Sequence, residues 1–214
     1  VSTCSYEARE YGIRSAMPVS TAYMRCPECI FLPVNMPLYR ETSASVMNII
    51  HEYSDRFQQV SIDEAYIDIS YAGSFDEAKR IGEEIMTRIL NEEGITCSVG
   101  IGPGKVIAKI ASGNRKPAGM TVVKQNEVRD FLDPIPVESI PGIGKKTKQR
   151  LEKHGILTIR DLSGCDIQNL QSAFGKHGIL MHRLAIGIDE SEVVEKKGQK
   201  SIGKQKTYQE DVRD

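Results

Sequence analysis

The chain has 214 residues, of which 40% are hydrophobic and 27% charged, and its formal net charge at pH 7 is −1. This composition is typical of a folded protein with one or two domains, and it excludes an intrinsically disordered chain. No apolar run approaches the roughly 20 residues of a membrane-spanning helix, and no signal-peptide pattern opens the chain, so the sequence predicts neither membrane association nor secretion.

The charge is divided unevenly along the chain. Residues 1–139 contain 14 Lys and Arg against 19 Asp and Glu, whereas residues 140–214 contain 14 against 10. A basic second part is suited to contact with phosphates, and the acidic first part indicates a separate role.

Hydrophobic periodicity predicts a mixture of helices and strands in the first part of the chain. Pro37 suits a helix start, and Ser74 with Glu77 forms a capping-box pattern before a helix that ends at Gly94. We expect helices at 6–11, 37–57, 75–93 and 106–111, and strands within 60–69, 95–101 and 121–123. This order predicts an α+β fold, with helices on one face of a mostly antiparallel sheet.

The second part of the chain has a different pattern. No strand is predicted in residues 124–188, which we interpret as an all-helical module with glycines between its helices. The charged stretch "DESEVVEKKGQK", from residue 189, predicts a linker. After it, "KSIGKQKTYQ" predicts a strand that begins a further domain.

The five cysteines form no disulfide framework in a chain of this length. Cys26 and Cys29 make a lone C-x-x-C motif, but a structural zinc site takes four ligands and no second pair accompanies this one. We therefore expect two free thiols in a protein of the reducing cytosol.

Two adjacent carboxylates, Asp63 and Glu64, interrupt the apolar segment "SIDEAYIDIS". Neighbouring residues of a strand point to opposite faces, so both carboxylates can meet only if the backbone bends between the strand pieces. A divalent cation would relieve their repulsion, and carboxylate oxygens are hard ligands that suit Mg²⁺. An exposed acidic turn is the alternative interpretation, because Asp is common in turns. Asp68 could be a third ligand, but it lies several residues further along the strand, and we expect it to face solvent.

Five stretches of the chain, in the order in which they occur, resemble the Y-family DNA polymerases of the DinB (DNA polymerase IV) kind. "TCSYEAREYGIRSAMP" resembles their fingers motif, and "SIDEAYIDIS" with "CSVGIGPGKVIAKIASGNRKPAGM" resembles their palm. "IPGIGKKTKQRLEKHGI" resembles the helix-hairpin-helix of their thumb, and "QKSIGKQKTYQEDV" resembles the entry to their little finger. The resemblance implies fingers at residues 1–34, a palm at 35–123, a thumb with its helix-hairpin-helix at 124–188, and a linker with the start of the little finger at 189–214.

The resemblance implies template-directed nucleotidyl transfer in which two Mg²⁺ ions stabilise the attacking and leaving oxygens. By the family's pattern, Asp63 and Glu64 are the catalytic and metal-binding pair. Asp63 would bridge both ions, and Glu64 would hold the ion that activates the primer 3′-hydroxyl. The family's third metal ligand and its steric-gate aromatic residue lie on a strand before the fingers motif. Because these 214 residues lack that strand and most of the little finger, we expect them to form a truncated and inactive member.

The resemblance also assigns nucleotide-binding residues. Thr3, Tyr6 and Arg9 would grip the triphosphate, and Lys116 would neutralise it, which suits hydroxyl, guanidinium and ammonium donors. An exposed polar helix face and a solvated basic loop are the plainer interpretations of these residues. Ser2 and Ala16 fall where the family covers the nascent base pair, and their small size predicts a roomy site for lesion bypass.

In the thumb, Gly142 and Gly144 would let backbone N–H groups approach a phosphate, with Lys145, Lys146 and Lys148 supplying charge nearby. Ile140, Ile143 and Leu151 are expected to be buried and structural. The implied partners are primer-template DNA and a dNTP, together with a sliding clamp reached through residues beyond Asp214. A monomer in the cytoplasm, associated with the nucleoid and acting in DNA repair, is expected.

Two other functions remain open at this point. A palm-type nucleotidyl cyclase would also use an acidic hairpin, although it needs no thumb that grips DNA. A non-catalytic DNA-binding protein would use the helix-hairpin-helix alone.

Overall fold

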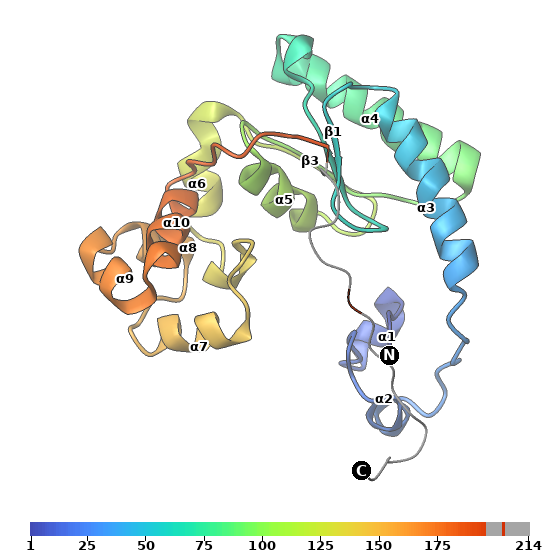
Figure 1. Cartoon of the computed structure of the whole chain (residues 1–214). Coiled ribbons are helices and arrows are strands. Elements are labelled where there is room, and N and C mark those ends of the chain that lie inside the picture. The colour runs from blue at the N-terminus through green and yellow to red at the C-terminus, as the bar shows by residue number, and fades with distance from the viewer. Residues whose placement is uncertain (196–202, 204–214) are drawn as a thin grey trace. The chain divides into compact units, whose positions relative to one another are not determined.

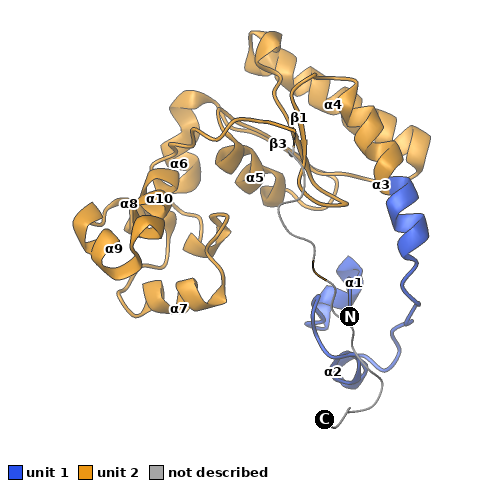
Figure 2. Ribbon diagram, viewed as in Figure 1, with its two compact units in different colours: residues 1–42 blue, residues 43–214 orange. Residues whose placement is uncertain are grey.

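The computed structural model of the chain describes residues 1–195 and residue 203 (Figure 1). The strand expected within "KSIGKQKTYQ" lies outside the described residues. The contacts between residues divide the chain into two compact units, residues 1–42 and residues 43–214 (Figure 2). Each unit is described by itself below.

The unit of residues 1–42 is built around short helices. It contains α1 (Tyr6–Glu10), α2 (Val19–Arg25) and the beginning of α3 (Met36–His51). Its small core consists of Ile13, Ala22 and Cys26. α1 begins after Ser5, whose hydroxyl accepts a hydrogen bond from the backbone N–H of Ala8 (3.3 Å).

A disulfide joins Cys26 and Cys29, so the expectation of two free thiols at this motif is wrong. The chain turns at the end of α2, where the N–H of Cys29 donates to the carbonyl of Cys26 (3.2 Å). This turn places the two Cα atoms 5.5 Å apart, within the range that a disulfide spans.

The first part of the unit of residues 43–214 combines helices with two small sheets. Its elements after α3 are β1 (Phe57–Gln59), β2 (Ala65–Ile67), the 3₁₀ turn η1 (Ser70–Ala72), α4 (Phe75–Glu93), β3 (Val99–Ile101), α5 (Lys105–Asn114) and β4 (Met120–Val122). β1 and β2 are antiparallel, with Gln59 opposite Ala65. β3 and β4 are parallel, with Gly100 opposite Thr121.

The sheet pairing therefore differs from the mostly antiparallel sheet that the sequence predicts. Among the described residues the strands form one antiparallel pair and one parallel pair. The reason lies in the connections, because a short bend can join only antiparallel strands, whereas a crossover helix returns the chain to pair in parallel. α5 is that crossover between β3 and β4.

The long helix α4 carries the apolar stripe that its spacing predicts. Ile81, Ile85 and Ile89 are buried and form a core with Ile49 of α3, and α3 and α4 run side by side (Figure 1). α4 begins after Ser74, whose hydroxyl accepts from the N–H of Glu77 (3.1 Å), so the predicted cap is confirmed at this residue.

The rest of the unit is almost entirely helical, as the sequence predicts. It contains η2 (Gln125–Glu127), α6 (Val128–Leu132), η3 (Val137–Ser139), α7 (Lys145–Glu152), α8 (Ile159–Ser163), α9 (Ile167–Phe174) and α10 (Lys176–Ala185). Leu132, Ile140, Leu151 and Met181 are among the fully buried side chains of its core. No helix in residues 1–195 is long and apolar enough to cross a membrane.

α5 belongs to both parts of this unit. Its buried residues Val106, Ile107 and Ile110 join the same hydrophobic core as the helices after residue 124. Its opposite side rests on β3 at Gly100, where an added Cβ would lie 1.9 Å from the carbonyl oxygen of Ala108. Only glycine allows this approach of a strand to a helix backbone.

Gly100→Ala tests this contact. Because backbone cannot move away as a flexible side chain can, we expect unfolding free energy to fall by about 2–3 kcal/mol. The measurement is urea denaturation followed by circular dichroism. Gly113→Ala is the matched control, since nothing lies within 4 Å of an added Cβ there. Alanine in a helix stabilises by about 0.5–1 kcal/mol relative to glycine, and equal effects of the two changes would contradict the proposed packing.

Candidate active site

The two adjacent carboxylates lie in the bend that joins β1 to β2. The N–H of Val60 donates to the carbonyl of Glu64 (2.9 Å), which closes the bend. The Ser61 hydroxyl donates to Asp63 Oδ1 (2.5 Å) and accepts from the Asp63 N–H (3.3 Å). The bend is thus held by its own hydrogen bonds, and the Asp63 side chain is exposed.

The bend begins earlier in the chain than the sequence predicts. We expected a strand piece at Val60 to Ile62, but β1 ends at Gln59. Val60 and Ile62 are 40% and 46% exposed, so their alternation does not reflect burial on one face of a sheet.

Helix α5 lies along this hairpin and presents two lysines to it. Lys109 Nζ makes an ion pair with Glu64 Oε1. One turn earlier, Lys105 Nζ donates to Gln58 Oε1 (2.9 Å) and lies 5.6 Å from the centre of the Tyr66 ring. The sequence alone does not place either lysine at the hairpin. Their spacing of four residues, on a helix whose other face is apolar, is the signal that could have located them here.

Tyr66 follows the carboxylate pair on β2. Burial raises the pKa of its hydroxyl, and the carboxylates of Glu64 and Asp189 raise it further. The Tyr66 hydroxyl is therefore harder to deprotonate than that of an exposed tyrosine.

The donors at the bend suit a hard divalent cation. Mg²⁺ is usually bound by one or two carboxylates and keeps several waters, so Asp63 and Glu64 fit it as a partial ligand set. Within the described residues there is no cluster of three or more His, Cys, Asp or Glu side chains that could hold a metal. The bend itself presents two carboxylates, one fewer than such a cluster requires.

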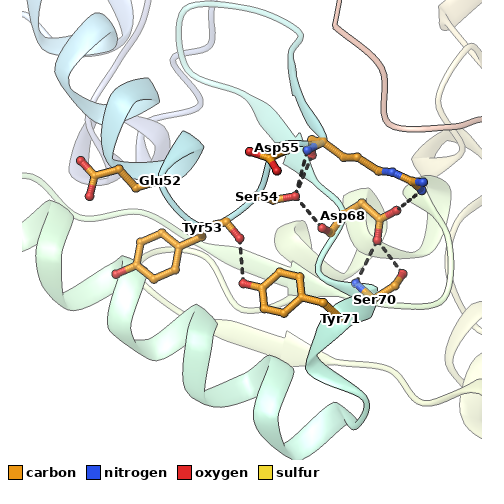
Figure 3. Close-up of a pocket in the computed structure, with 8 residues that line it drawn as sticks. Glu52, Tyr53, Ser54, Asp55, Asp68, Ser70 and Tyr71 are labelled. Atoms are coloured by element: carbon orange, nitrogen blue, oxygen red, sulfur yellow. Dashed lines mark hydrogen bonds and ion pairs between the residues drawn. The ribbon is translucent and has the colours of Figure 1, made fainter.

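Asp68 is committed elsewhere, in a pocket of about 690 Å³ beside the other end of the hairpin (Figure 3). Its Oδ1 accepts from the N–H (2.9 Å) and hydroxyl (2.5 Å) of Ser70, and its Oδ2 pairs with Arg56 (3.0 Å). The bonds from Ser70, followed by that from Arg56, lower the pKa of the Asp68 carboxyl. Asp68 thus makes its contacts at the open end of the hairpin, which we call its base, and not at the bend.

The residues expected at a triphosphate lie in both units. In residues 1–42, the Arg9 guanidinium lies 5.2 Å from the centre of the Tyr6 ring, so the two share a face of α1, and Thr3 is exposed just before that helix. Lys116 belongs to the other unit and is exposed in the loop after α5. That loop is tight, because a Cβ on Gly119 would lie 2.0 Å from the carbonyl oxygen of Arg115.

The helix-hairpin-helix segment has the geometry that its glycines allow. Gly142 has φ +94°, which side chains rarely adopt, and Gly144 is the N-cap of α7. On either side, Ile140, Ile143 and Leu151 are 1%, 5% and 0% exposed, so the prediction that they are buried is confirmed.

The three lysines of this segment differ in their surroundings. Lys148 Nζ lies 2.6 Å from Glu138 Oε1 and 3.7 Å from Glu152 Oε1, and its hydrogen bond lowers the pKa of Glu138. Lys145 and Lys146 have no ion-pair partner in residues 1–195. The charge at the start of α7 is therefore carried by Lys145 and Lys146.

The segment after α10, which is far from α5 in the sequence, caps the N-terminus of α5. The N–H of Val106 donates to Asp189 Oδ2 (2.8 Å), and Lys105 Nζ donates to the carbonyl of Glu192 (2.9 Å). Asp189, Lys105 and Glu192 also line a pocket of about 480 Å³ with Tyr66. Sequence reasoning expected only a linker here. The signal it missed is that the N-cap residue of α5 is Gly104, which has no side chain to cap the helix.

Comparisons with known proteins identify the family of the chain. Residues 1–113 match the model of the impB/mucB/samB family, and residues 138–189 match the DNA polymerase-iota thumb domain. The whole chain is 51% identical to "DNA polymerase IV 2" of Methanosarcina mazei and spans 58% of its length.

Solved structures give the same result. The crystal structure of DinB from Sulfolobus solfataricus has a TM-score of 0.81 and 34% identity, over 88% of this chain and 56% of that one. The "Insertion ternary complex of Dbh DNA polymerase" has a TM-score of 0.82 and 34% identity, over the same shares of the two chains.

These matches define a class of protein with a polymerase palm followed by a helical thumb. The chain belongs to the impB/mucB/samB family, and its relatives are Y-family polymerases of the DinB, or DNA polymerase IV, kind. The resemblance and the α+β fold class predicted from the sequence are thereby confirmed. The chain spans about three-fifths of the length of the curated relatives it matches.

Asp189→Ala tests the remote cap on α5. Loss of a capping carboxylate leaves a helix N–H without its partner, so we expect the free energy of unfolding to fall by about 1 kcal/mol. Glu190→Ala is the neighbouring control, because Glu190 makes only an exposed ion pair with Arg183, and such pairs contribute about 0–1 kcal/mol. Urea denaturation of both variants measures the difference, and a loss no larger at Asp189 than at Glu190 would argue against the cap.

Proposed function

We propose that this chain is the core of a lesion-bypass DNA polymerase, which adds dNTPs to a primer 3′-hydroxyl on a DNA template. The observation that carries the proposal is the acidic bend at Asp63 and Glu64, stiffened by its own hydrogen bonds, in a chain of this family. A relative solved as an insertion ternary complex supports it.

At the bend, Asp63 and Glu64 would hold the divalent cations, with Mg²⁺ as the ion of choice. Bound there, two such ions would act as Lewis acids on the attacking and leaving oxygens. The contribution of this chain is to fix the direction of both carboxylates before substrate arrives, since the Ser61 hydroxyl orients Asp63 and the Lys109 ammonium orients Glu64.

The incoming nucleotide would be held through its phosphates. Arg9 offers a guanidinium fork, Thr3 and Tyr6 offer hydroxyl donors, and Lys116 offers an ammonium, all of which are exposed. The tight loop after α5 limits where Lys116 can reach. Ser2 and Ala16 would leave room for damaged bases above the nascent pair.

The thumb would hold the DNA duplex by its backbone. Gly142 and Gly144, which precede α7, would let backbone N–H groups approach a phosphate, and Lys145 and Lys146 would add charge there. Lys148 would join them once it leaves its pair with Glu138. Contacts of this kind position DNA without reading its sequence, and they weaken with salt because counterions are released.

We infer the following division of labour: fingers at residues 1–34, palm at 35–123, thumb at 124–188, and linker with the start of the little finger at 189–214. The match of residues 138–189 to a thumb-domain model supports the boundary between thumb and linker, at residues 188 and 189. We further propose that the protein acts as a monomer on primer-template DNA, contacts a sliding clamp, and works in the cytoplasm at the nucleoid, where its substrate lies.

A non-catalytic DNA-binding role is the second candidate. It is favoured by the absence of a three-ligand metal cluster within the described residues. Residues 1–214 taken alone supply two of the three carboxylates that the resemblance leads us to expect, so this stretch by itself should bind DNA without extending a primer. Primer extension by the full-length protein distinguishes the two candidates.

Asp63→Asn tests the catalytic assignment in the full-length protein. The change keeps the shape of the side chain but removes a charge that binds metal. A metal ion contributes several kcal/mol to the transition state, so we expect primer extension to fall about 10³-fold or more. Duplex affinity should not change. Asp68→Asn, at the other end of the same hairpin, is the matched control and should keep its activity. An active Asp63→Asn variant would refute the assigned role.

Gly142→Val tests the thumb. A side chain at this residue blocks backbone approach to phosphate, and we expect duplex affinity to fall about tenfold, as for the loss of one charge-assisted hydrogen bond. Fluorescence anisotropy with labelled duplex at two salt concentrations measures it. Gly155→Val is the control, because Gly155 has a similar φ of +73° but lies at the other end of α7. Equal losses from both variants would show that strain, and not lost contact, is responsible.

A further inference from the structure

The ion pair between Lys109 and Glu64 places a cation on one of the two carboxylates proposed to bind metal. Lys109 Nζ contacts Glu64 Oε1, and the two side chains are 35% and 40% exposed. Glu64 can therefore interact with two kinds of cation: the Lys109 ammonium group, with which it is paired, and a divalent ion from solution.

Lys109 cannot move far from this place, because its helix is fixed on two sides. Ile107 and Ile110, which flank it on α5, are 0% and 7% exposed within the hydrophobic core. On the strand side, Gly100 holds the backbone of α5 at Ala108 against β3. The ammonium can swing only on its own flexible stem, so the distance from helix to bend is set by the fold.

The pair contributes little to the stability of the fold, since exposed ion pairs are worth about 0–1 kcal/mol. The ion pair mainly affects how the Glu64 carboxylate can bind a second cation. An ammonium group beside Glu64 occupies one of its oxygens, and its charge repels any second cation placed at the same bend. The same charge relieves the repulsion between Asp63 and Glu64 while no metal is bound.

We propose that Lys109 is a positioning residue for the metal site: it holds Glu64 in place in the metal-free protein and releases an oxygen of that carboxylate when a divalent cation binds. The proposal rests on the proposed function, because it requires Asp63 and Glu64 to be metal ligands. Lys109 thus lowers the affinity of the bend for a divalent cation in the absence of substrate, and keeps the carboxylates ordered until it arrives.

The test is Mn²⁺ binding to the protein without DNA or nucleotide, followed by electron paramagnetic resonance. We expect Lys109→Met to bind Mn²⁺ about fivefold more tightly than the unchanged protein, the size expected for removal of one ammonium at a partly solvated site. Lys109→Gln should behave in the same way, and Lys109→Arg should restore the original affinity. Unchanged or weaker Mn²⁺ binding by both neutral variants overturns the proposal.

Lys105→Met is the matched control, because it removes the same charge one turn earlier from the same helix. Lys105 contacts Gln58 and the carbonyl of Glu192 and makes no ion pair with Glu64. We expect its Mn²⁺ affinity to change by less than about twofold, because the interaction of charges falls with distance. An equal gain from Lys105→Met overturns the assignment to Lys109, since any lysine of α5 would then serve.

Asp63→Asn and Glu64→Gln separate this inference from the proposed function. If either change abolishes Mn²⁺ binding while the Lys109 variants bind as before, only the role of Lys109 fails. If neither change affects Mn²⁺ binding, the bend is not the metal site, and the proposed function fails together with this inference. Loss of binding in the acidic variants with a gain in the Lys109 variants supports both.

Discussion

The backbone contact between β3 and α5 is the constraint on which the rest of the larger unit depends. At Gly100 the strand approaches the helix so closely that a Cβ would lie 1.9 Å from the Ala108 carbonyl oxygen and 2.3 Å from the Ser112 nitrogen. The axial position and rotation of α5 are fixed by this approach. The backbone position of each residue on α5 is therefore set by the fold, and only the side chains beyond it can move.

Three parts of α5 make separate contacts. Its apolar face joins the core shared with the helices after residue 124. Its two lysines, Lys105 and Lys109, hold the β1–β2 hairpin at Gln58 and at Glu64. Its N-terminus receives Asp189 from the segment that follows α10. One helix of ten residues thereby connects the acidic bend, the helical second part and the chain that leaves it.

Local patterns in the sequence located most of the fold and part of the site. The stripe of Ile81, Ile85 and Ile89 on α4 and the buried residues beside Gly142 follow from periodicity, because burial on one face repeats with the helix. The strand at Val60 to Ile62 was misplaced, because an apolar alternation in a bend looks like one in a strand. Neither the cap from Asp189 nor the pair of Lys109 with Glu64 could be predicted, since each joins residues more than 40 apart in the sequence. Such contacts depend on how α5 is packed, which no local pattern encodes.

The charges of the hairpin distinguish Asp63 from its two acidic neighbours as the carboxylate that a cation would meet first. From Arg56 to Asp68, with both ends included, the chain has three acidic residues: Asp63, Glu64 and Asp68. Asp68 is paired with Arg56 at the base, and Glu64 is paired with Lys109 at the bend. Asp63 has only the Ser61 hydroxyl as a side-chain partner among the described residues, and its side chain is exposed. A divalent ion that approaches the hairpin would therefore meet one carboxylate, Asp63, that has no counter-charge. Beside it lies Glu64, whose counter-charge is on the flexible side chain of Lys109 and can move away. If the proposed metal site is correct, an order of binding follows from this difference: Asp63 would engage a divalent ion first, and Glu64 would join as Lys109 moves aside.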